Sequence, residues 1–242
     1  MRLPTFVPTS HRVTESQSRT HISLALRLRV SAASLIVAVA VLATPAAAAE
    51  IGPDMRVVIR TYDNAGLPPA DLRTATETAS RILKASGIDM AWHGCDVALV
   101  RNAAHPCAAP LRANEIAVRI VRLATDAGYR GDLPLGYSLV DTDSRSGTLA
   151  TIYIDRVAWL SGAAGVESPL LLGRAFAHEV GHLLLGTNGH SDTGLMRAVW
   201  SCASLQRNIR RDWLFSPGDS RAMRQAVRLR AVPQMARLGL GD

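Results

Sequence analysis

The stretch SPLLLGRAFAHEVGHLLLG, residues 168–186, restricts the fold of this chain more than any other segment. A proline near its start and a glycine at its end are typical of the two ends of a helix. Apolar residues flank His178, Glu179 and His182, so a helix here would place all three in apolar surroundings. Burial of such groups is costly unless something binds them. We therefore expect a buried helix that carries a binding site.

The spacing of these residues favours a metal ion. His178 and His182 are four residues apart, so both rings would project from one face of the helix, one turn apart. Two imidazoles so placed can bind one Zn²⁺ at about 2.0–2.1 Å each. Glu179 follows the first histidine and can accept a proton from a zinc-bound water without ligating the metal. The motif predicts a zinc hydrolase with Glu179 as general base.

A catalytic zinc ion usually has three protein ligands and one open position. No glutamate follows Glu179 in the sequence, so the third ligand has to be of another type. We favour His190, because Gly186 can end the helix in a left-handed conformation and Gly189 lets the chain bend back. Asp192 is the principal alternative. Further candidates by residue type are Cys202, Asp212 and Asp219.

The segment HEVGHLLLGTNGH, followed by SDTGLM, resembles the zinc-binding sequence and Met-turn of metzincin metallopeptidases. The family pattern is H-E-x-x-H-x-x-G-x-x-H with a methionine in a later tight turn. The resemblance implies zinc peptidase activity, with Met196 beneath the metal. Here His190 follows His182 by eight positions instead of six, and the glycine comes one residue late. We expect the two extra residues to extend the helix slightly and to widen the loop.

Residues 50–242 contain no repeat or low-complexity linker, so we expect a single α+β metallopeptidase domain. The metzincin-like fold would have a twisted mixed sheet of about four to five strands. It would also have a backing helix, an active-site helix, a Met-turn and a C-terminal helix. Alternation, helical periodicity and turn residues predict strands at 55–63, 87–95, 115–123, 133–141 and 147–160, and helices at 71–84, 168–185 and from about 216. Asp71 and Ser168 are the expected helix caps.

The resemblance also suggests where a substrate would bind. The strand at 147–160 is expected to form the rim of the cleft and to pair with an extended peptide. The segment after the Met-turn would form a wall, with Trp200, Leu205 and Phe215 as candidate lining residues that can equally be core. Candidates to assist the oxyanion, without support from a motif, are Tyr137 and Tyr153.

Residues 1–49 have the pattern of a secretory signal peptide with a long n-region. Arg27 and Arg29 precede an uncharged run, residues 30–49, that ends in small residues. We predict cleavage after Ala49 and a secreted or periplasmic protein. If the run is not cleaved, it is long enough for a membrane anchor.

The remaining charge and the cysteines fit an exported protein. The whole chain has a net charge of +7, but removal of residues 1–49 leaves 22 basic and 19 acidic side chains, a net charge of +3. This balance gives no reason to expect nucleic-acid binding. Export permits a disulfide, and Cys95 and Cys107 would close a short loop, although Cys202 leaves other pairings open.

Together these patterns predict an exported zinc peptidase that acts on peptide or protein substrates. The predicted zinc ligands are His178, His182 and His190. A monomer is expected. Two other functions remain open. One is a zinc amidase that acts on cell-wall peptides, and the other is a noncatalytic binding protein with a zincin fold.

Overall fold

The computed structural model describes residues 55–95, 105–123 and 134–231. The predicted signal peptide and its cleavage site lie outside these residues. The elements are, in chain order, β1 (Arg56–Asp63), α1 (Pro69–Ala85), β2 (Asp89–Gly94), η1 (Pro106–Ala108), β3 (Glu115–Val121), β4 (Gly136–Asp141), β5 (Ser146–Tyr153), α3 (Ile154–Ala164), α4 (Ser168–Leu185), α5 (Cys202–Arg207), η2 (Arg210–Trp213) and α6 (Pro217–Ala231).

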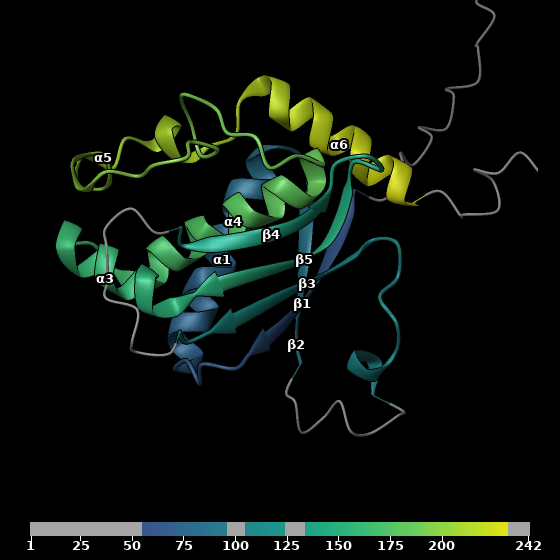
Figure 1. Ribbon diagram of the computed structural model, residues 1–242, viewed down its shortest axis with the longest axis horizontal. Helices are drawn as coiled ribbons and strands as arrows, with labels where there is room; N and C mark the ends of the chain where they lie inside the picture. The colour runs from purple at the N-terminus through teal and green to yellow at the C-terminus, as the bar shows by residue number, and fades with distance from the viewer. Residues whose placement is uncertain (1–54, 96–104, 124–133, 232–242) are drawn as a thin grey trace, which may run out of the picture. The chain divides into compact units, whose positions relative to one another are not determined.

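The five strands form one mixed sheet in the order β2-β1-β3-β5-β4. Strands β2, β1, β3 and β5 are parallel, and β4 runs antiparallel to β5 at the edge of the sheet (Figure 1). The α+β class, the number of strands and the two helices that pack on the sheet agree with the sequence prediction. No helix within the described residues is long and apolar enough to cross a lipid bilayer.

The prediction that residues 147–160 form a strand at the rim of the cleft is wrong in two respects. Strand β5 is an interior strand between β3 and β4, and β4 is the edge strand on this side of the sheet. The strand also ends at Tyr153, and the chain continues as helix α3. The buried residues of α3, which recur every three or four positions, have helical periodicity, and Gly165 ends the helix in a left-handed conformation (φ 65°).

Helices α1 and α4 cover the same face of the sheet, behind the strands in the view of Figure 1. The two helices approach closely at Gly173, where a Cβ atom would lie 2.5 Å from the backbone oxygen of Ala75. Helix α4 is buried along most of its length, and Phe176 is fully buried between the helix and the rest of the core. The sheet and α1 therefore hold α4 in a fixed position.

Two helix caps differ from the prediction. Helix α1 begins at Pro69, so Asp71 lies inside its first turn instead of capping it. Helix α4 begins at Ser168 with Glu167 as the N-cap residue, and no side chain caps it. In both helices a proline occupies the first turn, where the missing N–H would have had no partner in the helix.

A disulfide joins Cys95, at the end of β2, to Cys107 in η1. Next to this region the buried guanidinium of Arg60 pairs with the carboxylate of Glu115 and donates to the backbone oxygen of Ala109. The third cysteine, Cys202, is a free, half-buried thiol. The disulfide resolves the pairing that the sequence left open.

Candidate metal centre

Helix α4 presents His178, Glu179 and His182 in a buried setting, as expected from the apolar residues around them. Their relative exposures are 9%, 5% and 5%. The two histidine rings lie one turn apart with their centroids separated by 4.7 Å. The geometry of one helix therefore brings the two imidazoles together.

Backbone carbonyl groups fix the tautomer of both histidines. Nδ1 of His178 lies 2.9 Å from the oxygen of Leu195, and Nδ1 of His182 lies 2.8 Å from the oxygen of Thr187. Because a carbonyl oxygen can only accept, each Nδ1 carries the proton and donates it. Each Nε2 atom is then left with a lone pair and no hydrogen.

These two Nε2 atoms lie 3.0 Å apart. With both Nδ1 atoms protonated, neither Nε2 can donate to the other, and two lone pairs face each other in a buried site. A cation between them would remove this repulsion. Ligand nitrogens of a tetrahedral zinc ion at 2.0–2.1 Å are about 3.4 Å apart, close to the observed separation. The arrangement fits a metal ion.

Burial keeps both histidines neutral near pH 7. It lowers the pKa of His178 to about 4, although the hydrogen bond to Leu195 acts in the opposite direction. Burial also lowers the pKa of His182. Metal ions bind the neutral imidazole, so protons compete little with a metal for these two nitrogens at neutral pH.

The structure brings His190 to the same place. Its ring centroid lies 5.4 Å from that of His178 and 4.9 Å from that of His182. One ligand atom from each of the three histidines lies within 4.8 Å of the other two. His190 is exposed and lies on the loop that follows α4. Asp192 is exposed and is not part of this group.

The loop to His190 accommodates the two residues that exceed the metzincin pattern. Helix α4 continues to Leu185, one residue further than the pattern would place it, and Gly186 ends it with φ 64°. The second extra residue lies between Gly186 and His190. Gly186 is required for a further reason, because a Cβ atom there would lie 2.2 Å from the backbone oxygen of Arg145 in the β4–β5 turn.

A tight turn places Met196 beside the same helix. Gly194 has φ 75°, and the backbone N–H of Ser191 donates to the oxygen of Met196 at 2.8 Å. Met196 is buried, and its sulfur would lie 2.9 Å from a Cβ atom at Gly181. Gly181 lies between the two histidines of α4, so Met196 packs against the part of the helix that carries them.

The carboxylate of Glu179 is positioned by strand β4. The hydroxyl of Ser138 lies 2.7 Å from Oε2 of Glu179 and 2.8 Å from its backbone oxygen. A Cβ atom at Gly136 would lie 2.7 Å from Oε1, so only glycine leaves room for the carboxylate. Burial raises the pKa of Glu179 to about 7, and the hydrogen bond from Ser138 partly offsets this shift.

Neither Ser138 nor Gly136 was identified from the sequence. Both lie about 40 residues before Glu179, in a strand whose place in the sheet the sequence did not reveal. Their alternation in β4 was a usable signal, because residues two apart in a strand point to the same face. The only residue of β4 that the sequence analysis proposes for the site is Tyr137, which lies between them and is 53% exposed.

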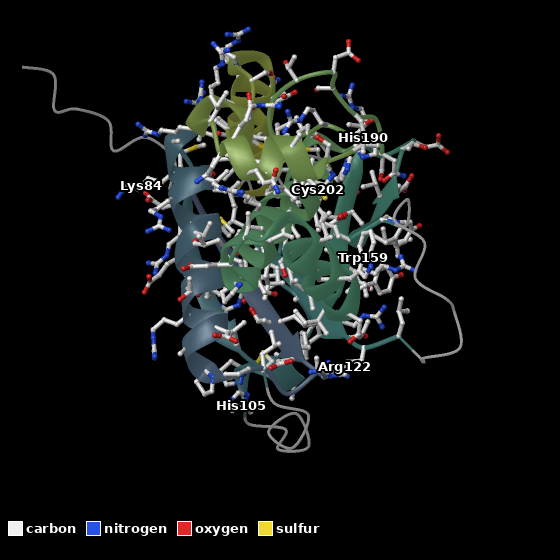
Figure 2. The ribbon with its side chains drawn as sticks, turned by 90° about the vertical axis from the view of Figure 1, so that its left-hand side faces the viewer. Lys84, His105, Arg122, Trp159, His190 and Cys202 are labelled. Atoms are coloured by element: carbon white, nitrogen blue, oxygen red, sulfur yellow. A yellow bond between two sulfur atoms is a disulfide. The ribbon has the colours of Figure 1, made fainter. Side chains whose placement is uncertain are left out.

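A cavity of about 570 Å³ opens beside the histidines and Glu179. Strand β4, helix α3 and the segment after Met196 form its walls, which include the exposed side chains of Tyr137, Trp159 and Val199. In Figure 2, His190 and Trp159 lie on the same side of the molecule, opposite Lys84 on helix α1. Trp200 also lines the cavity, whereas Leu205 and Phe215 are buried in the core and Tyr153 stacks with Arg156.

Two solved structures are similar to the chain in fold. A zinc-dependent peptidase from Methanocorpusculum labreanum has a TM-score of 0.44 and 14% sequence identity, covering 68% of this chain and 99% of its own. Archaemetzincin from Methanopyrus kandleri has a TM-score of 0.47 and 12% identity, covering 73% of this chain and 98% of its own.

No protein-family model matches the sequence, and no curated protein matches it. At the identities of the two solved structures, a likeness concerns the fold alone.

Proposed function

We propose that this chain is an exported zinc-dependent peptidase. In this proposal His178, His182 and His190 bind the metal and Glu179 is the general base. The observation that carries it is the pair of Nε2 lone pairs that face each other at 3.0 Å, with both Nδ1 protons committed to backbone carbonyls. Glu179 beside this pair is a carboxylate that a purely structural metal site would not need.

The donor set suits zinc, which commonly binds three protein ligands in a catalytic site and keeps one position open. When bound, zinc would supply Lewis acidity, which polarises a carbonyl group and lowers the pKa of water. Met196, packed against Gly181, would give the centre an apolar floor.

Glu179 would take the proton from the attacking water and deliver it to the leaving amine. Burial raises the pKa of this carboxyl to about 7 in the metal-free protein, and a bound cation would lower it again and so favour the carboxylate that accepts the proton. Ser138 would act as a positioning residue, because its hydroxyl lies 2.7 Å from Oε2. The glycine at 136 leaves the room that the carboxylate of Glu179 needs against strand β4.

The edge strand β4 supports a peptide as the substrate. It is hydrogen-bonded to β5 on one side, and an extended peptide could add to its free side through backbone hydrogen bonds. The apolar cavity walls of Tyr137, Trp159 and Val199 would favour bulky apolar side chains. Export is supported by the signal-like residues 1–49 and by the disulfide, which is typical of oxidising compartments.

The test is zinc content together with peptidase activity, measured on protein purified after expression of the full chain. We expect one zinc per chain and cleavage of an unstructured protein such as casein. Glu179→Gln should retain zinc and lose about 10²- to 10⁴-fold in kcat/KM. Absence of zinc would overturn the proposal, whereas zinc with cleavage of cell-wall fragments only would identify an amidase.

Two variants test the third ligand. His190→Ala should leave substoichiometric zinc after dialysis, because the centre retains only two protein nitrogens. Asp192→Ala is the matched control on the same loop and should retain one zinc per chain. The reverse result would assign the third position to Asp192. Mass spectrometry of the same samples reports whether the chain is cleaved after Ala49.

A further inference from the structure

A second cavity, of about 300 Å³, lies between helices α1 and α4 and the segment after α5. Three arginines line it: Arg81 from α1, Arg174 from α4 and Arg210 from η2. Among the described residues that line it, none is acidic. Helix α1 lies on the side of Lys84 in Figure 2, away from His190.

No carboxylate of the described residues makes an ion pair with the three arginines of this cavity. Arg81 donates to the hydroxyl of Thr78 at 2.9 Å, and Arg174 donates to the side-chain oxygen of Asn208, so both acceptors are neutral. Within the described residues the ion pairs involve other side chains: Arg60–Glu115, Lys84–Asp89, Arg122–Asp155 and Arg197–Asp212. Glu77 lies one turn before Arg81 but makes no ion pair with it within 4.0 Å.

The guanidinium of Arg174 is held in a fixed orientation. Its Cζ atom lies 3.9 Å from the ring centroid of Trp213, which is buried. Burial lowers the pKa of Arg174 to about 10, so the group is still charged at neutral pH. A charged, partly desolvated and immobilised guanidinium loses little entropy when it binds an anion.

We propose that this cavity binds a phosphate-type oxyanion, either inorganic phosphate or a phosphate monoester group. Guanidinium groups match the oxygens of phosphate in a bidentate geometry, and a dianion compensates more of the three positive charges than a single carboxylate does. The cavity volume admits a phosphate with a small substituent. The proposal is independent of the metal centre, although both sites use residues of α4.

A series of ring contacts gives binding a measurable signal. Trp213, under Arg174, makes an edge contact with Trp200 at 5.4 Å between centroids. An anion that pairs with Arg174 would change the charge next to Trp213 and therefore its fluorescence. The series of ring contacts extends from Trp200 to the candidate metal centre, because the ring centroids of Trp200 and His178 lie 5.5 Å apart.

The experiment is a titration of the purified full-chain protein with inorganic phosphate at constant ionic strength, followed by calorimetry and tryptophan fluorescence. The test variant is Arg81→Gln with Arg210→Gln, which spares Arg174 and its stacking on Trp213. The control is Arg73→Gln with Arg221→Gln, two exposed arginines with the same loss of charge. Melting curves establish that both variants are folded.

We expect saturable phosphate binding by the wild type and the control, and at least about tenfold weaker binding by the test variant. Equally weakened phosphate binding in both variants would show that diffuse electrostatic attraction is responsible and would overturn the proposal. Displacement of phosphate by chloride at the same concentration would overturn it in the same way. Absence of a phosphate signal would also overturn it unless vesicles bind. Phosphatidic acid vesicles that bind the wild type but not the test variant, beside neutral vesicles that do not, would identify a lipid headgroup as the source of the phosphate.

Discussion

The hydroxyl of Ser138 lies 2.7 Å from the Oε2 atom of Glu179, across 41 residues of sequence. This contact joins the edge strand of the sheet to the helix that carries the candidate metal ligands. In the proposed peptidase, the strand that binds the substrate therefore also orients the base.

Ser138→Ala tests this positioning role. Loss of a hydrogen bond to a charged group costs about 1.5–3 kcal/mol, so kcat/KM should fall by roughly 10- to 100-fold while zinc content stays at one per chain. Because this hydrogen bond lowers the pKa of Glu179, its loss should shift the acid limb of the pH profile of kcat/KM to higher pH. The pH profile is the deciding measurement.

Two further variants separate positioning from packing. Ser138→Thr retains the hydroxyl and should restore the acid limb. Thr148→Ala removes an exposed hydroxyl from the neighbouring strand β5 and should leave the profile as in the wild type. An unchanged acid limb in the pH profile of Ser138→Ala would show that Ser138 does not position Glu179 or shift its pKa.

The buried carboxyl of Glu179 predicts a pH-dependent stability in metal-free protein. Its pKa is raised from 4.5 to about 7 in the folded state, so the proton on it stabilises the fold. This stabilisation is complete below about pH 4.5 and is lost as the pH rises through 7. Glu179→Gln, which cannot ionise, should therefore be more stable than the wild type at pH 8, by an amount on the order of 3 kcal/mol.

Unfolding curves of both proteins in chelator at pH 5 and pH 8 measure this difference. His178, with its lowered pKa, acts in the opposite direction at acid pH, but it is present in both proteins and largely cancels. Addition of zinc should reduce the difference, because a nearby cation stabilises the carboxylate. Equal melting temperatures at pH 8 without metal would contradict the prediction.

Gly186→Ala should destabilise the protein, by about 2 kcal/mol or more. The residue has φ 64°, and a Cβ atom would lie 2.2 Å from the backbone oxygen of Arg145. Gly162→Ala is the matched control, because Gly162 lies in helix α3 with open space around it. Its substitution should stabilise the helix by up to about 1 kcal/mol. Chemical denaturation of the two variants should give opposite signs.

The disulfide should contribute about 3 kcal/mol, the value expected for a loop with a sequence separation of 12. Cys95→Ser combined with Cys107→Ser should lower the free energy of unfolding by this amount. Cys202→Ser, which removes the free thiol, should have a much smaller effect. A double variant as stable as the wild type would show that the bond does not restrain the unfolded chain.

Local patterns were sufficient to predict much of this fold. The ends of α4 followed from Pro169 and Gly186, and the approach of His190 followed from the glycines around it. Such features depend on residues within one or two turns of each other. The roles of the three histidines, Glu179 and Met196 stay predictions until a metal is measured.

Non-local features were not predictable in the same way. An interior strand and an edge strand can share the same alternation of apolar and polar residues, so the sequence alone does not show that β4, and not β5, is the edge strand. Helix α3 was missed because its β-branched residues resemble a strand, although Asp155 in the first turn and Gly165 at the end are helix signals. Ser138 could be assigned only when the sheet had placed it beside Glu179.

A fixed motif treats the number of residues between two ligands and the position of the ligands in space as one property. In the segment from His182 to His190 these two properties differ. The number of residues between these histidines exceeds the metzincin pattern by two. The backbone carbonyl of Thr187 nevertheless orients the ring of His182, and the ring of His190 still lies beside it. A genome search that requires six positions would pass over this chain. A search that allows one more residue on each side of a helix-ending glycine would retrieve it, and relatives with the same spacing.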